Sequence, residues 1–126
     1  MNRKLKVSFL ITCILIIGSA NAQNAKPAKQ AELKVKTSAQ CGQCKDRLER
    51  AMAFEKGVIS SNLNLEDKVF TVVYKPAKTT PEQIRKAISK TGYDADDVAA
   101  DTRAYDKLPP CCKKPDGTAP VEHKTE

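Results

Sequence analysis

The stretch Cys41-Gly42-Gln43-Cys44 decides how this 126-residue chain folds, because it joins an alternating segment, 31–37, to an amphipathic run that begins at Lys45. The change from a two-residue period to a helical period predicts a strand, a short loop and a helix. Cys41 then falls in the loop and Cys44 in the first helical turn, where unpaired N–H groups and the helix dipole favour thiolates. Two close thiolates suit either a soft metal ion or disulfide exchange.

The first 22 residues have the pattern of a secretory signal peptide. A basic start is followed by a short apolar run, 7–17, and by Ala20-Asn21-Ala22, which is typical of a cleavage site. We therefore expect export across the inner membrane to a periplasmic or extracellular location. The apolar run is too short for a comfortable membrane span, so we expect no span after cleavage; an uncleaved anchor is the alternative. Cys13 would be removed, which leaves four cysteines in an oxidising compartment.

Composition and charge exclude several classes of function. Losing Arg3, Lys4 and Lys6 with the signal lowers the net charge from +7 to +4, and no basic run is interleaved with aromatic residues. Such a chain does not have the pattern of a nucleic-acid-binding protein. The single histidine, His123, lies in the tail, so the folded part cannot contain a histidine-based catalytic triad. We expect that the protein is not an enzyme.

The segments around the cysteine motif predict an α+β domain over 31–100. In order, they indicate a strand, a helix, a hairpin of two strands, a second helix and a short fourth strand over 93–100. Thr80 is expected to cap the second helix, with Pro81 in its first turn. This β-α-β-β-α-β order predicts a ferredoxin-like sandwich, in which a four-stranded antiparallel sheet carries two helices on one face.

The flanking segments are less regular. A flexible leader is expected over 23–30, and a Cys-Cys-containing extension over 101–126, most of it a disordered tail. Adjacent cysteines such as Cys111 and Cys112 rarely form a disulfide with each other. The two prolines before them hold the chain extended. Either cysteine could add a third thiolate to a metal bound by Cys41 and Cys44, or it could form a resting disulfide with one of those two residues. An independent thiol site, or a bridge between chains, is the alternative.

In the order and spacing of its motifs, the chain resembles the heavy-metal-associated domain of copper chaperones, metal-pump N-termini and a periplasmic mercury-binding protein. The resemblance covers about 32–98 and rests on the following motifs: Cys41-x-x-Cys44, Gly57-Val58, Asn64-Leu65-Glu66, Thr80-Pro81-Glu82 and Gly92-Tyr93. Two features differ from the family. Ser38-Ala39-Gln40 stands where the family usually has Gly-Met-Thr, and the family usually ends near the fourth strand.

The resemblance implies a protein that binds a soft metal through Cys41 and Cys44 and sequesters it or hands it over. Two thiolates without a nearby histidine suit Cu(I) best; Hg(II) and Zn(II) are alternatives, and zinc needs further ligands. The resemblance implies that Tyr93 covers the metal loop, as the residue at the corresponding position does in bacterial relatives; packing on the core is the alternative for this residue. The implied partner is a metal transporter or another metal-binding domain, with an acidic face toward the basic residues of the first helix: Lys45, Arg47, Arg50 and Lys56.

A thiol–disulfide oxidoreductase is the alternative function, because a thioredoxin-like fold also places C-x-x-C between a strand and a helix. Against this alternative, a hairpin follows the first helix almost at once, and no aromatic residue flanks Cys41. Metal binding is therefore the preferred hypothesis.

Overall fold

The computed structural model describes residues 29–118 and 120. The elements in these residues are β1 (Ala31–Lys36), α1 (Gly42–Ala53), β2 (Val58–Asn64), β3 (Val69–Tyr74), α2 (Pro81–Lys90), α3 (Thr102–Asp106) and a 3-10 turn at Pro110–Cys112. The predicted signal peptide, most of the leader and the end of the tail lie outside the described residues. Within the described part, every helix is too short or too polar to span a membrane.

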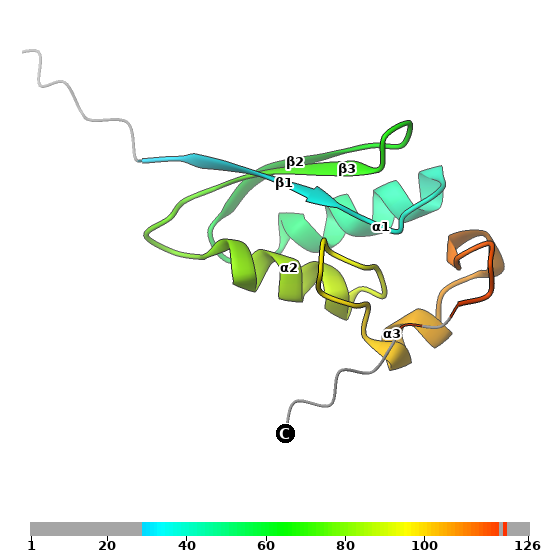
Figure 1. Ribbon diagram of the computed structural model, residues 1–126. Helices are drawn as coiled ribbons and strands as arrows, with labels where there is room; N and C mark the ends of the chain where they lie inside the picture. The colour runs from blue at the N-terminus through cyan, green and yellow to red at the C-terminus, as the bar shows by residue number, and fades with distance from the viewer. Residues whose placement is uncertain (1–28, 119, 121–126) are drawn as a thin grey trace, which may run out of the picture.

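Three antiparallel strands form the sheet in the order β1-β3-β2, so that β3 lies at its centre (Figure 1). Every residue of β1 has a partner in β3, which also pairs with β2 through a register shift near Val58. Successive strand side chains point to opposite faces. Phe70, Val72 and Tyr74 of β3 therefore share one face, and all three are buried. The predicted hairpin is confirmed.

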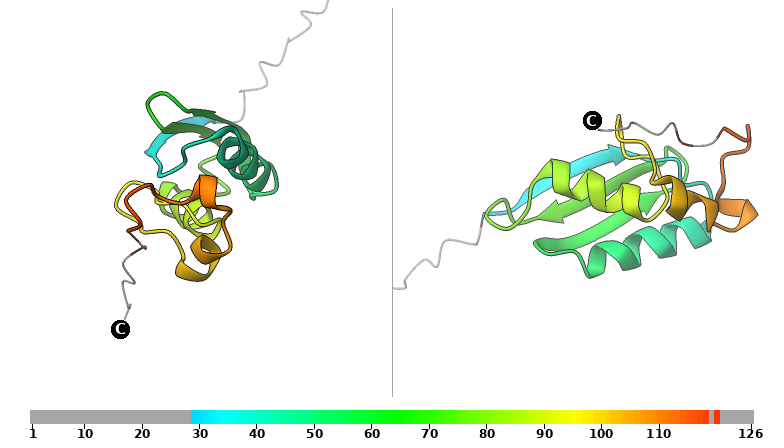
Figure 2. Two further views of the ribbon diagram at one scale, coloured as in Figure 1. Left: turned by 90° about the vertical axis from the view of Figure 1, so that its right-hand side faces the viewer. Right: turned by 90° about the horizontal axis from the view of Figure 1, so that it is seen from below.

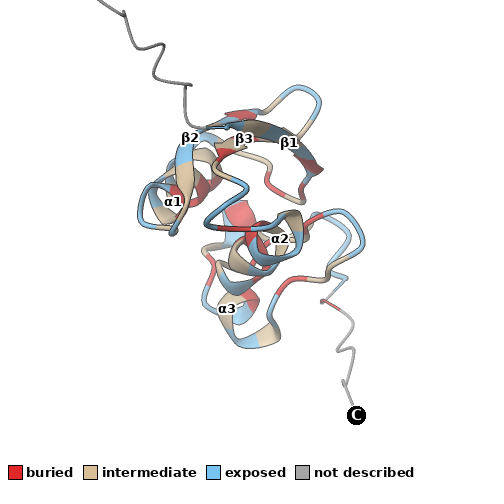
Figure 3. Cartoon of the chain, turned by 90° about the vertical axis from the view of Figure 1, so that its left-hand side faces the viewer, coloured by how far each residue is buried: buried red, intermediate tan, exposed pale blue. Residues whose placement is uncertain are grey.

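Helices α1 and α2 lie on the same face of this sheet (Figures 1 and 2). Their apolar stripes place Leu48, Met52, Ile84 and Ile88 in one core with Phe70. Figure 3 shows buried segments in both helices and in the sheet. Fully burying an aliphatic side chain of this size stabilises the fold by about 1.5–3 kcal/mol. Two helices packed on one sheet face agree with the predicted sandwich.

Helix α2 begins where the sequence predicts. The Thr80 hydroxyl accepts a hydrogen bond from the backbone N–H of Gln83 (3.3 Å), and Pro81 occupies the first turn. The hydroxyl satisfies one of the N–H groups that a helix start leaves unpaired, and proline has no such group to satisfy. Thr80 and Pro81 therefore determine where α2 begins.

The fourth strand predicted over 93–100 is wrong for these residues. Only isolated bridges form there, one of them between Thr37 and Ala95 at the end of β1. The reason is Asp96, whose backbone turns into the left-handed region (φ 53°). Its carboxylate accepts the Lys36 N–H (2.8 Å) in place of a strand carbonyl. The described sheet therefore has three strands, and a turn covers the outer edge of β1.

The C-terminal extension folds back onto the domain, although its sequence pattern predicted no regular element. The Asp101 carboxylate caps α3 by accepting the backbone N–H of Ala104 (2.9 Å). Three side chains of the extension belong to the core that the helices share: Tyr105, Leu108 and Cys112. Figure 2 shows α3 and the segment after it at the end of the domain where α1 begins. We call residues 101–114 the C-terminal hook.

Candidate metal centre

Cys41 and Cys44 lie where the loop after β1 enters α1. Cys41 is the N-cap of the helix, and its carbonyl accepts the Lys45 N–H (3.1 Å). Cys44 is fully buried on the inner stripe of the helix, whereas Cys41 is half-buried. The two Sγ atoms are 3.2 Å apart. The structure therefore brings the two predicted ligands together, with Cys41 nearer to solvent.

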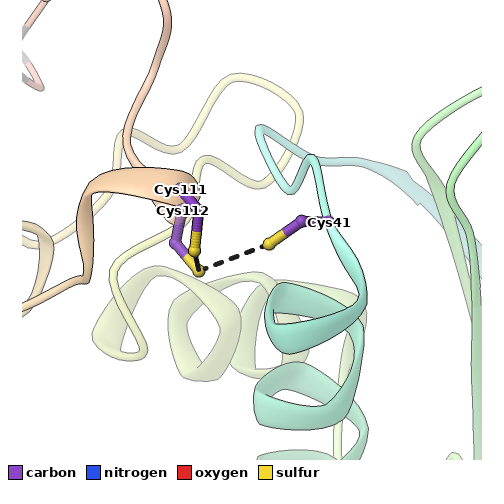
Figure 4. Close-up of side chains that lie close together, drawn as sticks. All are labelled: Cys41, Cys111 and Cys112. Carbon is purple, nitrogen blue, oxygen red and sulfur yellow. Dashed lines mark hydrogen bonds between the residues drawn. The ribbon is translucent and has the colours of Figure 1, made fainter.

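The C-terminal hook brings Cys111 and Cys112 to the same place. The Cys112 Sγ atom lies 3.6 Å from the Cys41 Sγ atom and 3.8 Å from that of Cys111 (Figure 4). The sulfurs of Cys41, Cys111 and Cys112 all lie within 4.8 Å of one another. Cys112 is buried and Cys111 is exposed. Among the alternatives for the adjacent cysteines, this geometry favours contact with the first pair over an independent thiol site.

Arg47 joins the thiols to Tyr93. One guanidinium nitrogen, Nη1, donates to the Tyr93 hydroxyl (3.1 Å) and to the Cys112 Sγ atom (3.5 Å). Tyr93 is fully buried and packs in the core, and its hydroxyl is held by Arg47 beside the thiols. The sequence pattern placed Arg47 only on the basic surface of α1. Its position three residues after Cys44, which puts both side chains on the same side of a helix, was the available signal.

The loop before Cys41 is held by residues that depart from the family pattern. Ala39 is buried. The Ser38 hydroxyl accepts the Asp94 N–H (3.0 Å), and the Gln40 side-chain amide donates to the Lys113 carbonyl (3.2 Å). The loop is therefore fixed on one side to the segment after α2 and on the other side to the hook.

Further contacts fix the end of the hook. The Lys114 N–H donates to the Tyr105 hydroxyl (3.0 Å), and the Lys114 ammonium group pairs with Asp94 (2.7 Å). The Lys113 ammonium group lies 5.8 Å from the centre of the Tyr105 ring, within the range of a cation–π interaction. None of these contacts involves sulfur. They place Cys111 and Cys112 beside α1 independently of any interaction between thiols.

The surroundings shift the pKa values of Cys41 and Cys112 in opposite directions. Partial burial opposes ionisation of Cys41, but hydrogen bonds from the side chain and backbone of Cys44, and from Cys112 and Cys111, outweigh it and lower the pKa of Cys41 to about 7. Burial raises the pKa of Cys112 to about 12, and its hydrogen bonds with Cys44 and Cys41 act in the same direction. Burial also raises the pKa of Tyr93, so its hydroxyl stays protonated. At pH 7, Cys41 is therefore about half ionised, whereas Cys112 and Tyr93 are protonated.

A cluster made of sulfur donors fits only some ligands. In the described part of the chain, the group of candidate ligands that lie close together consists of cysteines alone. Thiolates bind Cu(I), Zn(II) and related soft ions, whereas Mg²⁺ and Ca²⁺ need oxygen donors. The residues present therefore fit a thiophilic ion.

Comparison with known proteins identifies the family. The profile of the heavy-metal-associated domain matches residues 38–94. The copper chaperone CopZ of Staphylococcus aureus (strain JH9) is 39% identical over 54 residues, which make up 43% of this chain and 79% of that protein. The chain belongs to the heavy-metal-associated domain family. It is therefore a metal-binding protein of the kind to which copper chaperones belong.

Solved structures support the fold. The water-soluble region of the P-type ATPase CopA from Bacillus subtilis is 32% identical, with a TM-score of 0.51, and the match covers 54% of this chain and 46% of that one. Oxidised MerP from Ralstonia metallidurans CH34 is 20% identical, with a TM-score of 0.52, and the match covers 54% of this chain and 96% of MerP. At that identity, the likeness to MerP concerns the fold alone.

Two features of this chain differ from the family pattern or lie outside the family match. The ferredoxin-like arrangement is present, but a bridge and a turn stand in place of its fourth strand. The match ends at residue 94, so the C-terminal hook lies beyond it. None of the three relatives is named as a thiol–disulfide oxidoreductase, and the comparisons give that alternative no support.

Proposed function

We propose that this protein is an exported carrier of Cu(I), which Cys41 and Cys44 bind as thiolates. The observation that carries the proposal is the 3.2 Å separation of their Sγ atoms at the start of α1. Soft thiolate ligands select Cu(I), and the helix start stabilises the negative charge that they bring. The 39% identity to a copper chaperone supports the same ion. Hg(II) would suit the same pair, whereas Zn(II) requires more ligands.

Hand-over to a metal transporter or to another metal-binding domain is the second part of the proposal. The ion would pass by ligand exchange, in which a thiolate of the partner binds as one of this chain leaves. Support comes from the likeness to the CopA region of a P-type ATPase. On α1 and just after it, Arg50 and Lys56 are exposed, while Lys45 is paired with Glu49 and Arg47 contacts the thiols. An acidic partner surface would therefore meet fewer free positive charges than the sequence predicted.

Export rests on the predicted signal peptide. Cleavage after Ala22 would leave Gln23 as the first residue of the protein isolated from its native cell. N-terminal sequencing that finds Met1 instead would contradict cleavage.

Competition against a chromophoric Cu(I) chelator, on reduced protein without oxygen, tests the ligands. Replacing both residues, Cys41→Ser and Cys44→Ser, should weaken binding of one Cu(I) per chain by well over tenfold, or more than about 1.4 kcal/mol. The reason is that a serine hydroxyl is a poor ligand for a soft ion. Ser60→Ala, an exposed change on β2, is the control and should leave the affinity unchanged. An unaltered affinity in the double variant would refute the proposal.

A further inference from the structure

Three of the Sγ separations among the four cysteines are close to those of one coordination sphere. With metal–sulfur bonds of about 2.3 Å, two ligands of a tetrahedral ion lie about 3.8 Å apart. The Sγ separations are 3.6 Å from Cys41 to Cys112, 3.8 Å from Cys111 to Cys112 and 3.2 Å from Cys41 to Cys44. Each differs from the tetrahedral value by about 0.6 Å or less. The sulfurs of Cys41, Cys111 and Cys112 already lie within 4.8 Å of one another, and the Cys44 side chain would rotate toward them to complete the sphere.

We propose that the C-terminal hook completes a four-thiolate centre in which Cys111 and Cys112 join Cys41 and Cys44. Such a centre takes one thiophilic ion with a filled d shell, and it adds tetrahedral Zn(II) and Cd(II) to the Cu(I) of the proposed function. The inference rests on that function for the first pair of ligands and extends it to the second pair.

The hook is built to present its cysteines at this place. Its position depends on the burial of Tyr105 and Leu108 and on the hydrogen bond from Gln40 to the Lys113 carbonyl. Gln40 belongs to the same loop as Cys41, so one loop positions a ligand and also holds the segment that carries the other two. The contact between the two pairs of cysteines is therefore a consequence of the fold.

The charge of a four-thiolate centre is offset locally. Four thiolates around a divalent ion leave a net charge of about −2. The Arg47 guanidinium group lies 3.5 Å from the Cys112 Sγ atom, and Cys41 is the N-cap of the 12-residue helix α1. A guanidinium group and a helix N-terminus both stabilise nearby negative charge. These two groups offset part of the negative charge, and binding of the ion releases the protons of the thiols.

Packing alone does not account for both hook cysteines. A buried cysteine behaves as a small apolar residue, and this role would be sufficient for Cys112. Cys111 is exposed, so the core gains nothing from it, yet its sulfur lies within 4.8 Å of the Cys41 sulfur. Replacing Cys111 therefore tests the ligand role of the hook cysteines separately from any packing role.

The absorption of Cd(II)–thiolate bonds tests the number of ligands. Cd(II) is the probe, added to the reduced full chain, and the charge-transfer absorption per bound ion scales with the number of thiolates. Cys111→Ser should lower this absorption by about a quarter, and Cys111→Ser with Cys112→Ser by about half, because one or two of four tetrahedral ligands are lost. Gln43→Ala is the control, since it removes the side chain that Cys111 contacts and keeps every thiol. Unchanged absorption in the exposed-site variant Cys111→Ser overturns the inference.

Alkylation of the unmodified chain separates this inference from the proposed function. In the metal-free protein, Cys111 is exposed and should react with iodoacetamide. With one Cd(II) bound, peptide mapping should show Cys111 and Cys41 protected together. If Cys41 is protected and Cys111 reacts as fast as without metal, the four-thiolate centre is refuted and the two-cysteine site stands. If neither is protected, the two-cysteine site is refuted as well.

Discussion

Cys41 combines three properties that its neighbours do not share. It is half-buried, it forms the N-cap of α1, and its sulfur lies within hydrogen-bonding distance of the sulfurs of both Cys44 (3.2 Å) and Cys112 (3.6 Å). These hydrogen bonds lower its pKa to about 7 despite the opposing effect of burial. Because the thiolate is the form that binds metal, Cys41 is the residue at which an incoming ion is expected to bind first.

Alkylation as a function of pH measures this property. The rate at Cys41 in the reduced, metal-free protein should rise with pH and reach half of its maximum near pH 7, because only the thiolate reacts. In the urea-unfolded chain, the half-maximum should move up to the ordinary thiol value of about 8.5. Peptide mapping assigns the modified residue. Equal midpoints in the folded and unfolded chains would show that the surroundings do not stabilise the thiolate.

At the scale of elements, Gly92 determines how the hook leaves α2. Its φ of +102° lies in the left-handed region, and an added Cβ atom would lie 3.1 Å from the backbone of Ala104 and Tyr105. Gly92→Ala should therefore lower the free energy of unfolding by about 1–3 kcal/mol in urea titrations. Gly42→Ala is the control, because no atom lies within 4 Å of its Cβ position and alanine favours a helix by up to about 1 kcal/mol. Equal effects of the two substitutions would contradict this account.

The sequence predicted those elements whose signals are local. Thr80 and Pro81 mark the start of α2 by themselves, and the helical spacing of Cys44, Leu48 and Met52 indicates the buried stripe of α1. The prediction of a fourth strand over 93–100 was wrong because the conformation of this segment depends on a residue outside it. Arg85 binds the Asp96 carboxylate (2.8 Å) and stabilises a turn where the sequence analysis predicted a short edge strand.

The hook left only a faint pattern in the sequence. Tyr105, Leu108 and Cys112 follow one another at spacings of three and four, which is a helical period, but two prolines interrupt it. Its burial depends on the close approach at Gly92 and on the bond from the Asp101 N–H to the Ser89 carbonyl (3.0 Å), which no local pattern reveals. Cys41 and Cys44 were predictable as a pair because they form a local C-x-x-C motif at the start of one helix, whereas the contact of Cys111 and Cys112 with them depends on the path of the chain.

For the whole molecule, the hook is part of one core. Leu108 is 6% exposed and belongs to the same buried cluster as the helices. Leu108→Ala should therefore lower the free energy of unfolding of the entire domain by about 2–5 kcal/mol, with a single transition in urea. Leu65→Ala, at a half-buried position in the turn after β2, is the control and should cost less. Two separate transitions, or loss of the hook alone, would show that it folds independently of the domain.

The distance along the chain between Cys41 and Cys112, which is 71 residues, also determines the order in which the thiols become available during synthesis. A growing chain exposes Cys41 and Cys44 long before the ribosome has added the last two cysteines. During that interval, the early pair can react only with itself or with other molecules. Contacts between distant residues also form slowly, because closing a long loop costs entropy before any contact rewards it. A chain released before residue 111 would therefore keep the C-x-x-C motif and lose the arrangement that surrounds it.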